Sequence, residues 1–228
     1  YYLIKEIKKF YKRKKYGIVW DEERTKEIFE KESKDRFPIL RDAQSKEIQN
    51  NDELTHILIE GDNYHALSVL NYTHKNSIDV IYADPPYNTG SRSWKYNNDF
   101  VVKEDTFRHS KWLSYMEKRL RLAKNLLTVS GIIMITIDDY ELHTLGLLMD
   151  DIFGENNKLG TICIVNKADG RSDDEFIATA HEYMLVYSKN SKKARINELP
   201  TSEEEQKKTY RLEDSVSRYQ LKKGERKK

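Results

Sequence analysis

Three short apolar runs, each followed closely by an aspartate, set the fold class of this chain. Residues 56–60, 78–83 and 132–137 are rich in Ile, Leu, Val and Met, and their lengths suit buried strands. Segments with apolar residues at helical spacing separate the runs. This alternation predicts strand–helix–strand units, and therefore an α/β fold with a mostly parallel sheet.

A site is expected at one edge of this sheet. The carboxyl ends of parallel strands meet at the same edge, and ligands of open α/β sheets bind there. Asp62, Asp84 and Asp138 follow the three runs, so they are candidate site residues. Asn63 is a candidate N-cap for the helix that follows the first run.

Spacing and turn residues place the remaining elements. Apolar residues at helical spacing predict one helix that ends at Gly131 and a second that ends at Gly154. Residues 88–110 are polar and aromatic without a clear period, which predicts a long loop. The expected bounds of the later elements are 140–153 for the second helix and about 160–165 and 182–188 for two strands.

The flanks differ from this central part. Residues 1–53 are charged and are expected to form a helical or loosely ordered arm outside the core, and no further core element is expected after Asn190. Lysines and arginines crowd both ends of the chain. Basic ends can bind phosphates, but solvated charged faces are the commoner explanation. The net charge of +2 neither requires nor excludes nucleic acid.

The composition argues against several classes of protein. No apolar stretch approaches the length that crosses a membrane, and the N-terminus is charged where a signal peptide needs an apolar core. Cys163 stands alone in an apolar run, which predicts a buried, inert thiol in a reducing cytoplasm. The six histidines show no paired ligand spacing, so no metal site is expected.

The segment Asp84-Pro85-Pro86-Tyr87 carries most of the chemical information. Two prolines fix the backbone and remove two N–H donors, so a carboxylate and a fixed carbonyl can accept both hydrogens of an amino group. The tyrosine ring can stack on a flat heterocycle without using its hydroxyl. The exocyclic amine of a nucleobase is a poor nucleophile, and acceptors that orient its hydrogens favour attack on an electrophile. The alternative is a stiff turn with no chemical role.

The same segment carries a family resemblance. The run DPPYNTG at residues 84–90 resembles the catalytic motif of DNA amino-methyltransferases, in the permuted order of the modification subunits of type III restriction systems. The resemblance covers roughly residues 55–190. Other segments that resemble the family, in the same order, are GDNYHAL at 61–67, FRHSKWL at 107–113, IDD at 137–139 and AHEYMLVY at 180–187.

The resemblance implies a cofactor and a site. S-adenosyl-L-methionine would be the methyl donor, bound by Asp62, Asn63 and Asp84 on a partial Rossmann-like methyltransferase sheet. Asp62 matches the position near the adenine moiety of the cofactor, and its alternative role is to cap a helix. For the transfer itself, the residues implied as catalytic are Asp84, Pro85, Pro86 and Tyr87, the last stacking on a flipped base.

The resemblance also implies partners and a domain plan. Double-stranded DNA would be the substrate, with a restriction subunit as a further partner and a homodimer as the complete enzyme. Residues 54–190 would form the catalytic half of the methyltransferase domain, and residues 191–228 would lead to a recognition region. Lys95, Tyr96 and Phe100 would either meet DNA or pack as an ordinary loop.

Several alternatives remain open. Asp rather than Ser before the proline pair favours adenine N6 over cytosine N4 as the target. A non-catalytic DNA-binding or assembly remnant is the alternative from another class. Methylation of RNA or protein is disfavoured because that motif usually begins with Asn.

Two departures from the family suggest a truncated form or a fragment. The family has a glycine-rich loop that receives the methionine end of the cofactor, yet no two of the nine glycines are spaced Gly-x-Gly. The family's sheet runs in the order 3-2-1-4-5-7-6. By resemblance, the strands that end at Asp62 and Asp84 are the third and fourth, so the two strands between them are not in this chain.

We therefore expect residues 1–228 alone to bind S-adenosyl-L-methionine weakly or not at all and not to methylate DNA. Close approach of backbone to a ligand favours glycine, and an interrupted sheet exposes strand edges. Calorimetric titration with the cofactor and a methyl-transfer assay on mixed-sequence DNA measure both. Micromolar binding together with turnover would contradict the expectation.

Overall fold

The computed structural model describes residues 17–29, 37–43, 56–97, 99–166 and 176–197, together with three short strands after residue 211. The chain divides into two compact units, Tyr1–Ala194 and Arg195–Lys228, and each is described by itself. The second unit contains an antiparallel sheet in the order β7-β8-β9, where the sequence predicted no further core element. The bounds of its strands are Leu212–Glu213 for β7, Arg218–Lys222 for β8 and Glu225–Lys227 for β9.

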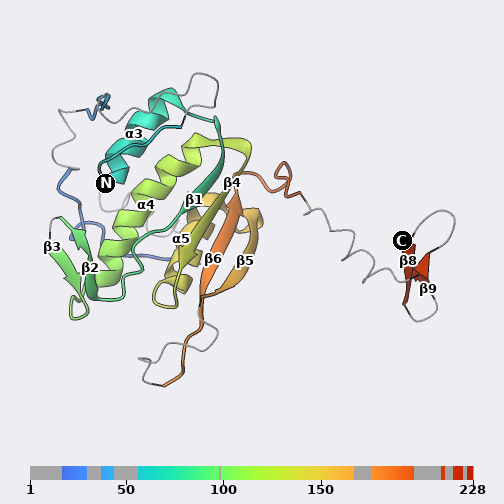
Figure 1. The fold of residues 1–228 in the computed structure, drawn as a ribbon. Helices are drawn as coiled ribbons and strands as arrows, with labels where there is room; N and C mark the ends of the chain where they lie inside the picture. Colours follow the sequence, from blue (N-terminus) through green and yellow to red (C-terminus); the bar gives the residue numbers. More distant parts are fainter. Residues whose placement is uncertain are drawn as a thin grey trace, which may run out of the picture. The chain divides into compact units, whose positions relative to one another are not determined.

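The first unit alternates helices and strands, as the sequence predicts (Figure 1). Its helices are α3 (Asn63–Thr73), α4 (Arg108–Leu126), α5 (Leu142–Phe153) and the short 3-10 helix η2 (Glu155–Asn157). The strands of its main sheet are β1 (Ile78–Ala83), β4 (Leu127–Ile137), β5 (Lys158–Val165) and β6 (His181–Ser188). A separate hairpin is formed by β2 (Ser91–Tyr96) and β3 (Asp99–Val102).

The main sheet runs in the order β1-β4-β6-β5. β1 is parallel to β4, whereas β6 is antiparallel to both β4 and β5. The α/β class is therefore confirmed, but the sheet is mixed rather than mostly parallel, because β6 returns between β4 and β5. The order equals the 4-5-7-6 part of the order implied by the family resemblance.

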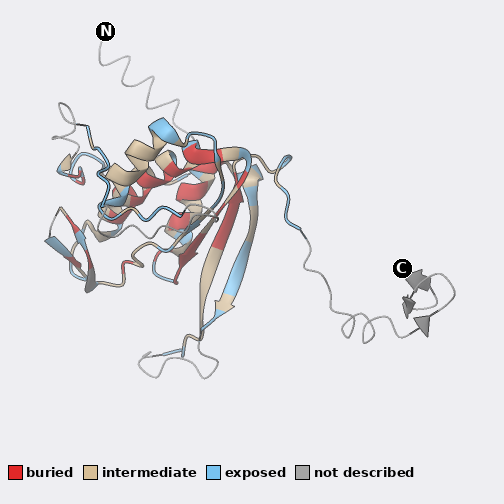
Figure 2. Cartoon of the chain, turned by 45° about the horizontal axis from the view of Figure 1, so that its top comes forward, coloured by how far each residue is buried: buried red, intermediate tan, exposed pale blue. Residues whose placement is uncertain are grey.

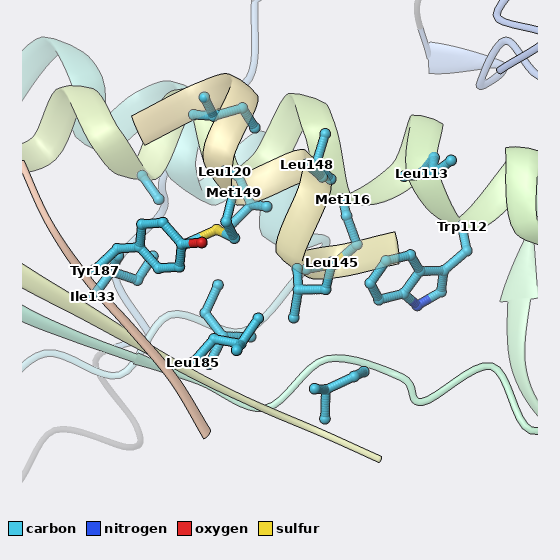
Figure 3. Packing of buried hydrophobic residues seen from close by; sticks show 14 of the residues in the cluster. Trp112, Leu113, Met116, Leu120, Ile133, Leu145, Leu148, Met149, Leu185 and Tyr187 are labelled. Carbon is cyan, nitrogen blue, oxygen red and sulfur yellow. The ribbon is translucent and has the colours of Figure 1, made fainter. Parts of the chain in front are cut away.

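One face of the sheet carries the hydrophobic core. Ile133, Ile135 and Leu185 alternate toward α4 and α5 and are at most 1% exposed. Figure 3 shows Ile133 and Leu185 of the strands on the side of the sheet where Leu120 of α4 and Leu145 of α5 lie. Figure 2 shows the same distribution over the ribbon, with buried residues on the helices and central strands. This packed face holds the strand ends in place.

The opposite face of the sheet is partly open. Val80, Tyr82 and Ile162 project on this side and are 56%, 60% and 51% exposed. The prediction of a buried second strand is therefore wrong for β1, which lies at the edge of the sheet and is covered on one face. Sheets with parallel strands are normally covered on both faces.

Residues 56–60 do not form the strand that the sequence predicts. They are assigned to no strand, and Ile57 and Leu58 are 68% and 94% exposed. The apolar composition suits a buried strand, but no strand among the described residues supplies the hydrogen bonds that one needs.

Three further expectations are corrected. Residues 88–110 contain the β2–β3 hairpin rather than only a loop, because its aromatic residues pack inward: Trp94 is 7% exposed. The helix predicted to end at Gly131 ends at Leu126, and the apolar residues that follow it begin β4. Cys163 is exposed rather than buried because β5 is an edge strand.

None of the described helices is both long enough and apolar enough to cross a membrane.

Truncating a side chain to alanine should destabilise the protein much more on the packed face of the sheet than on the open face. Ile133→Ala should lower the free energy of unfolding by about 2–5 kcal/mol, because Ile133 is fully buried and its loss leaves a cavity. Val80→Ala, the matched control on the open face, should change it by about 0.5 kcal/mol or less. Urea unfolding followed by circular dichroism measures both. Equal losses in the two variants would show that the open face is covered in solution.

Candidate active site

The carboxylate of Asp84 lies at the carboxyl end of β1 and faces solvent. The parallel pairing of β1 with β4 sets Ala83 opposite Ile135, so Asp84 comes beside Thr136. The Thr136 hydroxyl donates to Asp84 Oδ1 at 2.7 Å. Asp84 is exposed whereas Thr136 is buried. A fixed donor beneath the carboxylate therefore orients it while leaving its other acceptor positions available.

The proline pair presents one free and one occupied carbonyl. Trp112, a fully buried residue near the start of α4, donates from Nε1 to the Pro86 carbonyl at 2.6 Å. The carbonyl of Pro85 receives no hydrogen bond from the part of the chain that the structure describes. The acceptor that the family resemblance assigns to the target amine is thus the one left open.

Tyr87 is partly buried and anchored at its hydroxyl. Its ring packs against the hydrophobic core, and the hydroxyl donates to Glu182 Oε2 on β6 at 3.1 Å. Burial raises the pKa of the Tyr87 phenol far above its usual range, with the nearby carboxylates of Asp84 and Glu182 adding to the increase and the Thr136 hydroxyl opposing it. The phenol therefore keeps its proton and acts as a donor.

Asn88 fixes the backbone directly after Tyr87. It is fully buried and has a left-handed conformation, φ 59°, which asparagine tolerates better than most residues. Its Nδ2 donates to Glu141 Oε1 at 2.5 Å, and its Oδ1 accepts from Trp94 Nε1 at 3.0 Å. His109 Nδ1 lies 2.6 Å from the same Glu141 oxygen. Sequence reasoning assigned no role to Glu141, because a fully buried carboxylate has no local signature.

Asp62 occupies the start of α3, where the sequence predicted Asn63 as the cap. Asp62 is the N-cap, and its Oδ1 accepts from the backbone N–H of Tyr64 at 2.8 Å. Both of its oxygens also accept from Arg119 Nη2, at 3.3 and 3.2 Å. Asn63 is exposed at the first position of the helix. The geometry thus shows Asp62 in the helix-capping role, and its cofactor-binding role stays a prediction.

Arg119 joins Asp62 to the N-terminal segment. Its guanidinium is 7% exposed, donates to both oxygens of Glu27 and lies 3.6 Å from the centre of the Tyr115 ring. Burial raises the pKa of Glu27, while the hydrogen bond and charge of Arg119 oppose that rise. Residues 17–29, which the sequence placed in a charged arm, therefore contribute a buried ion pair to the first unit.

A cavity of about 410 Å³ lies beside Asp62. Its walls are mostly apolar: Phe29, Phe37, Pro38, Ile39, Leu40, Ile59, Ala66 and Val69. A carboxylate has about four acceptor positions, and the bonds from Tyr64 and Arg119 leave room on Asp62 for one more donor. The residues present therefore fit a flat, apolar group that carries an amino group. The described residues contain no cluster of His, Cys, Asp or Glu that could hold a metal ion.

The hairpin places its three candidate DNA-contacting residues differently. Tyr96 is 4% exposed and its hydroxyl donates to the backbone carbonyl of Thr25, so it packs inside the unit. Phe100 is 52% exposed, and Lys95 Nζ lies 4.7 Å from the centre of its ring. Of these three residues, Lys95 and Phe100 remain candidates for contact with DNA.

Comparison with known proteins decides the family. Residues 78–228 match the family model described as DNA methylase, which covers N6 and N4 methyltransferases. The chain belongs to the DNA methylase family. This family membership confirms the resemblance on which the sequence analysis relied, although it does not separate adenine from cytosine as the target.

Two relatives by sequence agree with this membership. The type II methyltransferase M.KpnI of Klebsiella pneumoniae is 44% identical over 131 residues, covering 57% of this chain and 31% of that protein. The EcoPI Mod subunit of Escherichia phage P1, a type III restriction-modification enzyme, is 30% identical over 196 residues, covering 75% of this chain and 30% of that protein. The chain thus spans less than a third of the length of these relatives. The solved PvuII DNA methyltransferase, titled cytosine-N4-specific, gives a TM-score of 0.41 at 13% identity, covering 55% of this chain and 47% of that one.

The buried ion pair of this DNA methylase predicts an asymmetric response to charge removal. Glu27→Ala should lower the free energy of unfolding by about 3 kcal/mol, because it leaves the buried guanidinium of Arg119 without one of its two carboxylate partners. Glu23→Ala is the matched control, since Glu23 pairs with Lys26 on the surface and is 84% exposed, and should cost about 0.5 kcal/mol or less. Thermal unfolding of both variants tests this, and a neutral Glu27→Ala would mean that residues 17–29 are detached in solution.

Proposed function

We propose that this chain carries the target-base half of an S-adenosyl-L-methionine-dependent DNA adenine-N6 methyltransferase, the modification component of a restriction-modification system. The observation that supports it most is the strand end itself. An exposed, oriented carboxylate, a fixed carbonyl that accepts no hydrogen bond from the described residues, and an anchored aromatic ring lie within the four residues Asp84–Tyr87.

These groups suit the chemistry of a weakly nucleophilic amine. Asp84 and the Pro85 carbonyl accept hydrogen bonds from the two amino hydrogens, which directs the nitrogen lone pair toward the methyl donor. As the nitrogen attacks, it gains positive charge, and the carboxylate stabilises that charge. Tyr87 supports the plane of the flipped base by stacking. The cofactor, when bound, supplies the electrophilic methyl group.

The cofactor would be held partly by Asp62 and Asn63 beside the apolar cavity. The one acceptor position left on Asp62 suits the amino group of the adenine moiety, and the cavity walls suit its ring. Asp84, at the end of β1, would face the reacting end. No pair of glycines in the chain has the Gly-x-Gly spacing of the loop that receives the methionine end.

Adenine is preferred over cytosine as the target because Asp84, rather than serine, precedes the prolines. Cytosine N4 is the second candidate, since the family model covers both chemistries. Mass spectrometry of nucleosides after methyl transfer separates N6-methyladenine from N4-methylcytosine.

Partners are proposed from the relatives. Double-stranded DNA is the substrate of a DNA methylase, and several similar proteins are Mod subunits of type III restriction-modification enzymes. A restriction subunit is therefore proposed as a partner of the complete protein. A homodimer of the complete enzyme is proposed from the family resemblance alone.

The carboxylate is tested in the holoenzyme, meaning this chain together with the segment that carries the glycine-rich loop. Asp84→Ala should reduce kcat by about a hundredfold or more, corresponding to roughly 3 kcal/mol or more of lost stabilisation. Asp79→Ala is the matched control, because Asp79 is an exposed carboxylate on the same strand whose side chain, among the described residues, accepts a hydrogen bond from Thr128. Single-turnover methyl transfer measures both. Retention of most activity by Asp84→Ala would refute the assignment.

A further inference from the structure

Two polar residues, Thr136 and Glu182, lie on the same face of the sheet and contact the segment Asp84–Tyr87. Thr136 of β4 is paired with Met184 of β6, and Glu182 is two residues from Met184 along the same strand. Because side chains alternate along a strand, Thr136, Met184 and Glu182 project on one face. The two polar side chains are therefore diagonal neighbours across adjacent strands, within reach of the same small region.

Each of these two residues forms a hydrogen bond with one of the two side chains proposed to hold the base, Asp84 and Tyr87. Thr136 donates to Asp84 Oδ1 at 2.7 Å, and Glu182 accepts from the Tyr87 hydroxyl at 3.1 Å. Thr136 is 2% exposed, so its hydroxyl is a fixed donor rather than a surface group. The acceptor and the stacking ring are thus both tied to the same pair of hydrogen-bonded strands.

The bond from Tyr87 constrains a motion that the prolines leave free. The proline pair fixes the backbone before Tyr87, and buried Asn88 fixes the backbone after it. Neither residue fixes the rotation of the tyrosine side chain. A hydrogen bond at the far end of the ring removes that freedom, and the sequence alone gave no reason to expect it.

We propose that Glu182 is a positioning residue for the target base, acting through the Tyr87 hydroxyl as Thr136 acts on Asp84. This inference rests on the proposed function. The sheet holds the stacking ring and the acceptor in a fixed relative orientation before the base arrives. The entropy of ordering the ring is then lost on folding rather than on base binding, which favours the reactive geometry.

The proposal predicts a specific order among variants of the holoenzyme. Glu182→Leu should lower kcat about tenfold with little change in the KM for S-adenosyl-L-methionine. Glu182→Gln should recover most of that loss, because its amide oxygen still accepts from the tyrosine hydroxyl. Tyr87→Phe should resemble Glu182→Leu. The double variant Tyr87→Phe with Glu182→Leu should be no slower than either single variant, because both remove the same bond.

The hydrogen bond from Thr136 to the carboxylate of Asp84 is tested in the same way. Thr136→Val should lower kcat about tenfold, and Thr136→Ser, which keeps the donor, should restore it. These losses need not multiply with those of Glu182→Leu, because the Thr136 hydroxyl also acts on the Tyr87 phenol to which Glu182 is bonded.

Three results separate the possible failures. Inactive Asp84→Ala with fully active Tyr87→Phe and Glu182→Leu would overturn the positioning role and leave the proposed function standing. Active Asp84→Ala would overturn the proposed function itself. A third pattern would show a purely structural role for Glu182 and would also overturn the proposal. In that pattern the losses from Tyr87→Phe and Glu182→Leu multiply in the double variant, and every Glu182 variant, including Glu182→Gln, has a lowered melting temperature.

Discussion

The parallel pairing of β1 with β4 is the constraint on which the candidate site depends. Its register sets Ala83 opposite Ile135, and the next residue of β1 is Asp84. Ile135 is held by the core between the sheet and the helices α4 and α5, so the register cannot slip without turning apolar side chains out of that core. The position of one carboxylate is therefore specified by packing some distance away from it.

Local signals predicted the parts of the site that are local. The strand, the aspartate at its end and the two prolines lie within a few residues. As the sequence predicted, β1 ends at Ala83 directly before Asp84, although β1 is an exposed edge strand rather than a buried one. The partners of these residues could not be predicted from the sequence. Trp112, Thr136 and Glu182 come from segments 26, 52 and 95 residues away from the groups they bond. The strand predicted over residues 56–60 fails for a related reason, because a strand also needs a neighbour that its own sequence does not specify.

Buried polar groups surround the site, and disturbing their hydrogen bonds would lower the free energy of unfolding. Asn88 and Glu141 are fully buried and bonded to each other, and Arg119 is held between Glu27 and Asp62. Removing one member of such a set leaves a partner without compensation, which usually costs more than the bond contributes. Through Arg119, the N-terminal segment and the start of α3 are joined to α4. Through Glu141, the start of α5 is joined to the segment that follows β1.

The strand order has a consequence for the timing of synthesis. β6 lies between β4 and β5 but follows both of them in the chain. On the ribosome, β4 and β5 therefore emerge with no strand between them, and each waits for the same late segment. The arrival of His181–Ser188 joins the two strands and brings Glu182 to Tyr87 at the same time. The last of the four strands of the main sheet to be translated thus both joins β4 to β5 and completes the anchoring of the aromatic ring.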